Sequence, residues 1–267
     1  MKQLLNKVIF LTGGSAGIGL ECAKKSLENG AIVVIVANTP ESLRHAAEVL
    51  NSENVHFMLC DVAYAAEVEQ AINKTIAQFG QIDVIHNNAG FAQPSSPIHT
   101  TSDEEWYRLF DVNVKSIMLT ARYGIEALIK TAGCIINTSS LVGEIGQDNH
   151  AAYAATKGAV NALTKSMALD YAPFKVRINA VAPAGVWTDM LRKWSSEQPD
   201  PGSMERYLNN IHALGYCPEG DVVADACVFL ASDNAKFITG HIMPVSGGAE
   251  LGYRVVTMQE QVALSVK

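Results

Sequence analysis

The stretch Thr12-Gly13-Gly14-Ser15-Ala16-Gly17-Ile18-Gly19 decides the fold of this 267-residue chain. It follows a short β-branched run, 7–12, and leads directly into a helical pattern that starts near Gly17. Glycines at a strand–helix junction permit a tight turn and let a diphosphate approach backbone N–H groups, and the helix N-terminus favours the negative charge. The sequence therefore predicts a dinucleotide-binding loop. The loop residues that we expect to contact the cofactor are Gly13, Ser15, Ile18 and Gly19.

The same residues also fit the GxSxG pattern of a hydrolase nucleophile elbow, with Ser15 as the nucleophile. Such an elbow needs earlier strands that supply an oxyanion loop. A single predicted strand precedes Ser15, so we reject the hydrolase interpretation. A plain strand–helix turn is the simpler alternative, and the four glycines of this stretch favour the ligand loop over it.

Short apolar runs alternate with longer helical patterns along most of the chain. The predicted strands are 7–12, 31–37, 55–60, 82–87, 134–139, 176–182 and one near 238–245. The predicted helices are 17–29, 40–51, 64–79, 103–130, 150–171 and 221–231. Near-continuous apolar strands are typical of a parallel sheet that is covered on both faces. The alternation therefore predicts a Rossmann-type doubly wound α/β fold with right-handed crossovers and helices on both faces.

We expect residues 1–267 to form a single dinucleotide-binding and catalytic domain, because the chain shows no internal repeat or linker. The regular alternation breaks at 188–216, where Trp194, Pro199, Pro201 and Gly202 interrupt the pattern just after Trp187. Long irregular segments of this kind often close over a bound molecule. The stretch 188–216 is therefore the candidate for a mobile lid over the substrate.

Composition excludes several classes of protein. With 48% hydrophobic and 18% charged residues, the chain is too apolar for a disordered protein. Its net charge of −7 and its lack of a basic cluster argue against nucleic-acid binding. The longest apolar run, 31–37, is far shorter than the ~20 residues of a membrane span. Lys7 interrupts the N-terminal apolar stretch, so we expect no export signal, no membrane association and a cytoplasmic protein.

Cysteine and histidine spacing bears on metal sites and disulfides. The five cysteines form no CxxC pair, and the seven histidines form no HExxH or HxxxH pair. We therefore expect buried, unpaired cysteines in a reducing compartment, with no disulfide framework and no metal site.

The end of the second strand is where the ribose of a dinucleotide is usually recognised. An acid there binds the 2′-hydroxyl of NAD, and a basic residue binds the 2′-phosphate of NADP. This chain has Ala37-Asn38-Thr39, which offers neither. The lack of a basic residue favours NAD, whereas the missing acid leaves NADP open. We expect Asn38 to contact the ribose.

The ends of the next two strands complete the predicted cofactor site. Asp61 and Val62 follow the third strand and suit the adenine, with an ordinary helix N-cap as the alternative. Asn87-Asn88-Ala89-Gly90 follows the fourth strand. We expect Asn88 and Gly90 to pack the glycine loop against the adenosine, and a plain turn is the alternative there.

Tyr153 and Lys157 lie in a helical stretch at a spacing that puts both side chains on one face. The phenol of a free tyrosine has a pKa of about 10. A neighbouring ammonium stabilises tyrosinate and lowers that pKa, so Tyr153 is a candidate general acid/base.

The chain holds a second Tyr-x-x-x-Lys pair, Tyr171 and Lys175, so the pattern alone is weak evidence. In that copy, Pro173 disfavours a continuous helix. Tyr153 instead has Ser140 before it, at the end of the fifth strand. A hydroxyl at that place can hold the substrate oxygen that Tyr153 protonates, which makes Ser140 a candidate for both catalysis and substrate binding.

Asn113 lies in the segment 111–115, inside the predicted helix 103–130. Asparagine is poorly suited to the interior of a helix. This position therefore indicates a special role for Asn113, and a local kink in the helix is the alternative.

These residues resemble the classical short-chain dehydrogenase/reductase family. The matching segments span nearly the whole chain in the same order: TGGSAGIG (12–19), NNAG (87–90), VNV (112–114), Ser140 with YAATK (153–157), NAVAPAGVWT (179–188) and FLASDNAKFITG (229–240). The resemblance implies a seven-stranded sheet of order 3-2-1-4-5-6-7, NAD or NADP as cofactor, and a homotetramer. It also implies a catalytic tetrad, which falls on Asn113, Ser140, Tyr153 and Lys157.

The same resemblance implies particular roles for several residues. Asn113 would anchor a water molecule for proton relay, and Lys157 would also hold the nicotinamide ribose. Val186 and Thr188 would contact the carboxamide and the pyrophosphate of the cofactor.

Within the family, three segments look like the branch of hydroxysteroid and L-fucose dehydrogenases: SSLVGEIGQ (139–147), QPDP (198–201) and GGAELGY (247–253). This implies that Gln147 and Leu191 line the substrate pocket and that Tyr253 reaches a pocket of a neighbouring subunit.

The chain also departs from that branch. Ala37 stands where the branch has Asp, which weakens the inference of NAD. Ala184 and Ser246 replace a usual glycine and a usual aspartate. Phe91 and Ala92 stand where the branch has polar ring side chains, so the substrate can differ.

We therefore predict an oxidoreductase that moves hydride between nicotinamide and a small molecule. The substrate would be a secondary alcohol or ketone, or a sugar lactol, of the L-fucose-like or hydroxysteroid class. One alternative is a 3-oxoacyl-thioester reductase that acts on an acyl carrier protein, and the acidic charge balance counts against it. The other is a non-catalytic nucleotide-binding scaffold, which would have no need of Tyr153 and Lys157 beside Ser140.

Overall fold

The computed structural model describes residues 2–93 and 95–252, and within them one parallel sheet has the order β3-β2-β1-β4-β5-β6-β7. All neighbouring strands pair in parallel. This confirms the predicted doubly wound sheet and its strand order. The strands are β1 (Val8–Thr12), β2 (Ile32–Ala37), β3 (Val55–Leu59), β4 (Val84–Asn87), β5 (Cys134–Thr138), β6 (Arg177–Pro183) and β7 (Ile242–Val245).

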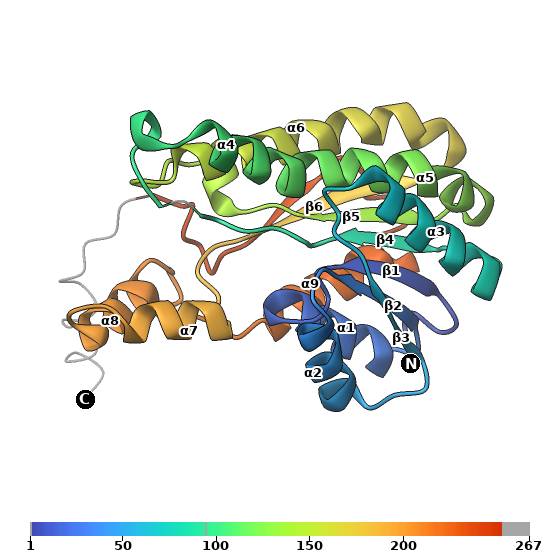
Figure 1. Ribbon diagram of the computed structural model, residues 1–267, viewed down its shortest axis with the longest axis horizontal. Helices are drawn as coiled ribbons and strands as arrows, with labels where there is room; N and C mark the ends of the chain where they lie inside the picture. Colours follow the sequence, from blue (N-terminus) through green and yellow to red (C-terminus); the bar gives the residue numbers. More distant parts are fainter. Residues whose placement is uncertain (1, 94, 253–267) are drawn as a thin grey trace.

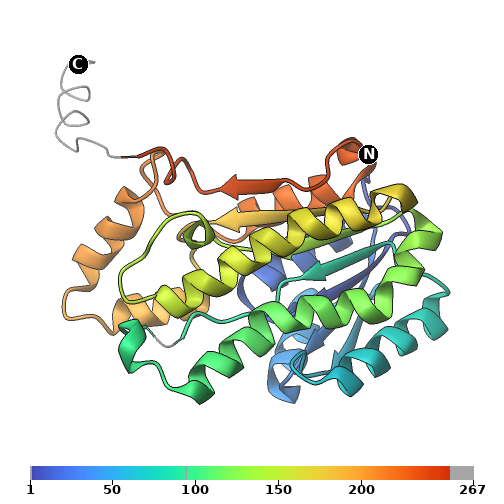
Figure 2. The same cartoon turned by 90° about the horizontal axis from the view of Figure 1, so that it is seen from above.

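Helices cover both faces of this sheet (Figure 1, Figure 2). One face carries α1 (Gly17–Glu28), α2 (Pro40–Leu50) and α9 (Asp221–Ala231). The other carries α3 (Ala65–Phe79), α4 (Asp103–Phe110), α5 (Ser116–Thr131) and α6 (Ala151–Tyr171). The segment after β6 forms α7 (Asp189–Ser196) and α8 (Pro201–Asn210), which project beyond the sheet on the left of Figure 1. Short 3₁₀ turns are η1 (Ile98–Thr100), η3 (Leu141–Gly143), η4 (Ala172–Phe174) and η5 (Asp233–Ala235).

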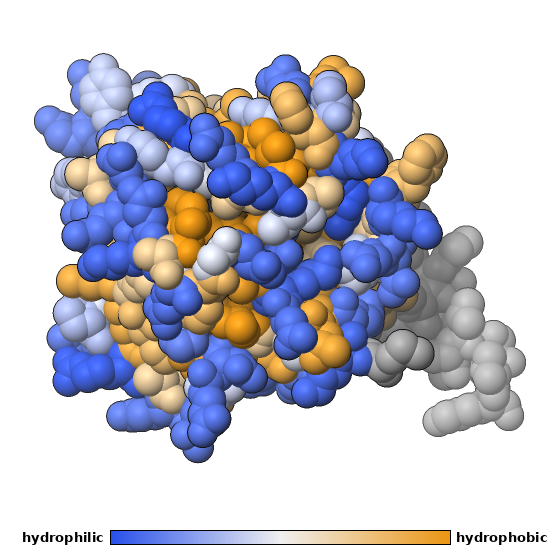
Figure 3. Space-filling model, turned by 90° about the vertical axis from the view of Figure 1, so that its right-hand side faces the viewer, coloured by the Kyte–Doolittle hydropathy of each residue, from blue (hydrophilic) through white to orange (hydrophobic). Residues whose placement is uncertain are grey.

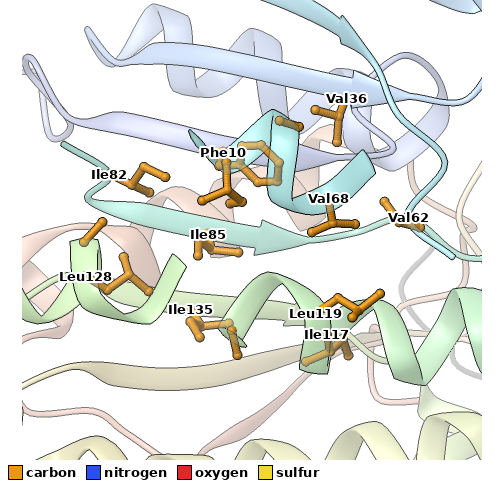
Figure 4. Close-up of a cluster of buried hydrophobic side chains, with 14 of the residues drawn as sticks. Phe10, Val36, Val62, Val68, Ile82, Ile85, Ile117, Leu119, Leu128 and Ile135 are labelled. Carbon is orange, nitrogen blue, oxygen red and sulfur yellow. The ribbon is translucent and has the colours of Figure 1, made fainter. Parts of the chain in front are cut away.

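A separate apolar core lies on each face of the sheet. Figure 4 shows one of them, in which Phe10, Ile85 and Ile135 of the strands pack against Val68 of α3 and Leu128 of α5. Side chains of α1 and α9 fill the core on the other face. Burial of each such side chain contributes about 1.5–3 kcal/mol to stability. The two cores fix the strands in register, so the strand ends meet along one edge.

The predicted helix 103–130 is not continuous. It consists of α4, a π-helical turn η2 (Asp111–Lys115), and α5. The start of α4 has a capping box, in which Ser102 and Glu105 exchange side-chain hydrogen bonds with backbone N–H groups. The π turn contains Asn113, so the local distortion that stood as the alternative to a special role is present at this residue. Such turns often occur at functional sites, because they redirect a side chain out of the helical register.

A row of buried polar side chains joins β4 and β5 to the helices above them. Asn87 Nδ2 donates to Asn137 Oδ1 at 2.9 Å, and Asn137 Nδ2 donates to Thr164 Oγ1 of α6 at 2.9 Å. The hydroxyl of Thr120 in α5 donates to Asn87 Oδ1 at 2.7 Å. Buried polar groups are costly unless they are hydrogen-bonded. This row therefore fixes α5 and α6 relative to the strands that carry the site.

The side of the molecule opposite α7 and α8 is mainly hydrophilic, with apolar residues scattered among the polar ones (Figure 3). None of the helices in the described part of the chain combines the length and the apolar character needed to cross a membrane.

Candidate active site

The loop between β1 and α1 is held close to neighbouring backbone. Gly13 and Gly17 have positive φ angles of 64° and 52°. A Cβ atom on Gly13 would lie 2.8 Å from the Cα of Ala89, and one on Gly19 would lie 2.1 Å from the Gly13 carbonyl oxygen. Neither position can hold a side chain without a shift of the backbone. The N-cap residue of α1, Ala16, provides no side-chain acceptor for the first-turn amides, which suits an anion at this helix end.

The loop after β4 is bound to the glycine loop through Thr12. Its Oγ1 accepts hydrogen bonds from the backbone N–H groups of Asn88 and Ala89, each at 3.0 Å. Asn88 Nδ2 donates to the carbonyl oxygen of Gly13 at 2.9 Å. The loop 87–90 is therefore bound to the glycine loop, and its contact with adenosine stays a prediction. Thr12 was not among the predicted cofactor-binding residues, although it stands at the end of the first predicted strand.

The segment after β6 reaches the same loop. A Cβ atom on Gly17 would lie 3.2 Å from Cγ2 of Thr188, so Thr188 stands beside the predicted pyrophosphate site. Thr188 also caps α7, because its Oγ1 accepts from the N–H of Leu191 at 3.2 Å. Val186 is buried in the core of α1 and α9. Ser15 is buried in the glycine loop itself, and Ile18 packs against that same core.

The segment 37–39 at the end of β2 contains no basic residue. Asn38 is exposed, and the hydroxyl of Thr39 caps α2 by accepting from the N–H of Ser42. Arg44, one helical turn further on, pairs with Glu41 at 3.0 Å.

Asp61, after β3, has partners within the protein. Its Oδ2 accepts from Arg108 of α4 at 2.9 Å, and its Oδ1 accepts from the N–H of Ala63 at 3.0 Å. The neighbouring Val62 is buried in the first core. Asp61 is not the N-cap of α3, which is Tyr64, so the helix-cap alternative is not realised in that form. Contact of Asp61 and Val62 with adenine stays a prediction.

Tyr153, Lys157 and Ser140 come together as predicted. Tyr153 and Lys157 belong to the start of α6, and the Lys157 Nζ atom lies over the Tyr153 ring, 5.6 Å from its centroid. Ser140 follows β5, and its side chain lies close enough to Tyr153 to lower the pKa of the phenol. The Lys157 Nζ atom donates to the carbonyl oxygen of Thr138 at 2.8 Å. This hydrogen bond anchors the ammonium group at the end of β5, beside the serine.

Burial moves the pKa values of the lysine and the tyrosine in opposite directions. It lowers the pKa of Lys157 from 10.5 to about 8. It raises the pKa of Tyr153 above its ordinary value, and the nearby Ser140 side chain lowers that pKa in part. This corrects the expectation that Lys157 lowers the pKa of Tyr153. The physical reason is that desolvation of the phenol outweighs the other influences, while Lys157 directs a hydrogen bond to Thr138.

Asn113 organises the loop after β4. Its Oδ1 accepts from the N–H of Phe91 at 3.1 Å, and its Nδ2 donates to the Phe91 carbonyl at 2.9 Å and to Thr156 Oγ1 at 3.1 Å. A Cβ atom on Gly90 would lie 3.1 Å from Asn113 Oδ1 and 3.6 Å from Lys157 Nζ. Gly90 therefore leaves open the space beside both groups. The role of Asn113 in holding a water molecule stays a prediction.

The predicted substrate residues are less closely defined. Gln147 is exposed between η3 and α6, and Leu191 is half-buried in the first turn of α7. Tyr253 lies outside the described residues. The second Tyr-x-x-x-Lys pair is not helical throughout, because α6 ends at Tyr171 and Lys175 has a φ of 61°.

Comparison with known proteins identifies the kind of protein to which this geometry belongs. A family model described as "Enoyl-(Acyl carrier protein) reductase" matches residues 13–250. L-fucose dehydrogenase of Bos taurus is 38% identical over 92% of this chain and 90% of that enzyme. The chain belongs to the classical short-chain dehydrogenase/reductase family. Meso-2,3-butanediol dehydrogenase of Serratia marcescens is also 38% identical, over 91% of this chain and 94% of that enzyme.

Solved structures of short-chain dehydrogenases agree with this assignment. The aldohexose dehydrogenase of Thermoplasma acidophilum, in ligand-free form, superposes with a TM-score of 0.86 at 31% identity, covering 95% of this chain and 98% of that one. This short-chain dehydrogenase/reductase is thus an oxidoreductase that acts on CH–OH groups with a nicotinamide dinucleotide. The residues present fit such a cofactor, because the loop 13–19, the cofactor cradle, lies at the N-terminus of α1, where Ala16 provides no side-chain cap for the first-turn amides.

Gly19→Ala tests the cradle. The new Cβ atom would collide with the Gly13 carbonyl and with Asn88 Nδ2, so we expect the dissociation constant for NAD(H) to rise at least ~10-fold, the equivalent of about 1.4 kcal/mol. Fluorescence titration with NADH measures it. Gly202→Ala in α8, where a Cβ atom meets only ordinary contacts, is the control. Unchanged affinity in Gly19→Ala would contradict the assignment of the loop.

The Lys157→Met variant tests whether burial lowers the pKa of Lys157. Because the folded pKa of Lys157 is near 8 and the unfolded one near 10.5, the unfolded chain binds more protons between these values. The free energy of unfolding should therefore rise with pH across this window, by about 3 kcal/mol in all. In Lys157→Met this rise should be absent. Urea unfolding at a series of pH values measures it, with Lys165→Met, exposed on the same helix, as the control. Parallel pH profiles for wild type and Lys157→Met would refute the burial argument.

Proposed function

We propose that this protein is an NAD-linked dehydrogenase that interconverts a secondary alcohol, or the lactol of an L-fucose-like sugar, with its carbonyl product. The observation that carries the proposal is the assembly of Ser140, Tyr153 and Lys157 beside Gly90 at the edge of the glycine cradle. A scaffold that only binds nucleotide would not need these groups at this place.

Proton transfer is the part of the reaction that the chain itself would perform. When bound, the nicotinamide ring supplies the hydride acceptor or donor. In the direction of reduction, Tyr153 Oη donates its proton to the carbonyl oxygen, and the raised pKa keeps the phenol protonated for this step. In the direction of oxidation the same atom accepts the hydroxyl proton. Ser140 Oγ holds the substrate oxygen by a hydrogen bond.

Lys157 and Asn113 would support this chemistry from the sides of the cradle. Lys157, anchored on the Thr138 carbonyl, would donate to the nicotinamide ribose. Asn113, fixed by its bonds to Phe91, would hold a water molecule for proton relay.

The remaining cofactor contacts would come from the loops already described. Gly13, Ser15, Ile18 and Gly19 would surround the diphosphate, with Thr188 beside it. Val186 would meet the carboxamide. Support for NAD over NADP comes from the segment 37–39 beyond β2, which has no basic residue and where Asn38 can bond a ribose hydroxyl.

The substrate would lie under the segment 188–216, which we propose as the lid. Gln147 and Leu191 would line the pocket from two sides. Two relatives of equal identity, named for L-fucose and for meso-2,3-butanediol, support a hydroxylated substrate without choosing its size. Assembly into a homotetramer, which the family resemblance implies, is measured by light scattering after gel filtration.

A substrate panel tests the proposal as a whole. We expect NAD reduction with L-fucose-like sugars or hydroxysteroids, and a lower kcat/KM with NADP, since the segment 37–39 has no basic residue. The panel also includes 3-oxoacyl thioesters with NADPH. A higher kcat/KM for the thioesters would favour the acyl-thioester reductase instead. No turnover with any member would favour the scaffold.

Tyr153→Phe removes the proposed proton donor and keeps the ring. We expect kcat to fall by at least ~10²-fold, while the affinity for NADH stays close to that of wild type. Steady-state kinetics in both directions measure this. Tyr171→Phe, in the second Tyr-x-x-x-Lys pair, is the matched control and should retain activity. Near-normal turnover in Tyr153→Phe would refute the assigned role.

A further inference from the structure

A second group of reactive side chains lies on the opposite face of the sheet from the tyrosine and lysine. Cys22 of α1, His86 of β4 and Cys227 of α9 bring one ligand atom each to within 4.8 Å of one another. Their exposed fractions are 1%, 3% and 4%. The distance from Cys227 Sγ to His86 Nε2 is 3.8 Å. None of these side chains has a part in the proposed reaction.

The donor set matches the preference of one class of metal ion. Two cysteine sulfurs and an imidazole nitrogen are the ligands that zinc takes in many proteins, with tetrahedral geometry. Zn–S bonds of about 2.3 Å and Zn–N bonds of about 2.0–2.1 Å put sulfur and nitrogen about 3.6 Å apart in such a site. The observed separation of 3.8 Å between Cys227 Sγ and His86 Nε2 is close to this value.

Charge balance selects a divalent ion. The two cysteines belong to the apolar core that contains Ala23, Val84 and Val228, where an uncompensated charge is costly. Two thiolates and a neutral imidazole cancel the charge of a dication, whereas a monovalent ion would leave a net negative charge. We propose that Cys22, His86 and Cys227 bind one Zn²⁺ ion between α1, β4 and α9. Binding replaces two S–H bonds by two Zn–S bonds and releases two protons to solvent.

The site is connected to the cofactor cradle. Thr138 Oγ1 lies 3.1 Å from His86 Nε2 and offers an oxygen for the fourth position. The carbonyl of His86 accepts from Thr12 Oγ1 at 3.4 Å, and Cys22 belongs to the helix that begins at the glycine loop. An ion there would tie α1 and α9 to β4 directly beneath the cradle. Its role would be structural, because the triad is closed to substrate.

Metal analysis of the whole protein tests the proposal. We expect protein purified under reducing conditions from zinc-supplemented cells to hold one zinc per chain by mass spectrometry of the elements. The buried ion should resist chelator in the folded protein and be released on denaturation. Protein folded with Co²⁺ should show thiolate-to-cobalt charge transfer and the visible bands of a tetrahedral ion. Loading should raise the melting temperature by roughly 5 °C at saturating metal.

Variants locate the ion. Cys22→Ala and Cys227→Ala should each lose the zinc and the cobalt bands, whereas Cys134→Ala, a buried cysteine of the same core, should keep both. Circular dichroism shows whether each variant is folded, and the measurements on the wild type do not depend on the variants. Wild-type protein with no more zinc than Cys22→Ala overturns the proposal. So does a cobalt spectrum without thiolate charge transfer, which would leave only hydrogen-bonded thiols, or a Cys22–Cys227 disulfide in protein that takes up no metal after reduction.

Discussion

The hydroxyl of Thr12 holds together the two loops on which the cofactor cradle depends. It accepts the N–H groups that follow β4, while Asn88 returns a hydrogen bond to the Gly13 carbonyl. These bonds lie between β1 and β4, where the strand order of the doubly wound sheet reverses and ligands bind in such folds. The backbone of both loops therefore lines the crevice. The two loops approach each other so closely that a side chain does not fit at Gly13.

The buried position of Lys157 shows how the fold changes the pKa of a side chain. Its ammonium group is buried at the carboxyl end of β5 and depends on the Thr138 carbonyl for its hydrogen bond. Desolvation disfavours the charged form of the lysine and the ionised form of Tyr153 alike. Burial of Lys157 at this position therefore lowers the free energy of unfolding at neutral pH. A group that is held there at such a cost is typical of an active site rather than of a structural core.

Relatives of equal identity carry names with different substrates, a sugar and a small diol. They share an activity on CH–OH groups with this chain. In this chain the helices α7 and α8 lie beyond the sheet and contribute no residue to either of the two large cores. A fold of this kind therefore indicates the reaction class and leaves the substrate to the particular site.

The sequence by itself determined the alternation of strands and helices, the glycine loop and the shared helix face of Tyr153 and Lys157, because these depend on local spacing and on the conformations that glycine allows. The order of the strands was implied by the family resemblance. Only the tertiary structure decided the raised pKa of Tyr153, the pairing of Asp61 with Arg108, and the meeting of Cys22 with His86 and Cys227. Burial and pairing are properties of groups brought together from distant parts of the chain, and no local pattern contains them. Asn113 belongs to both kinds: its place in the helix indicated a special role or a kink, but its partners came from the loop after β4 and from α6.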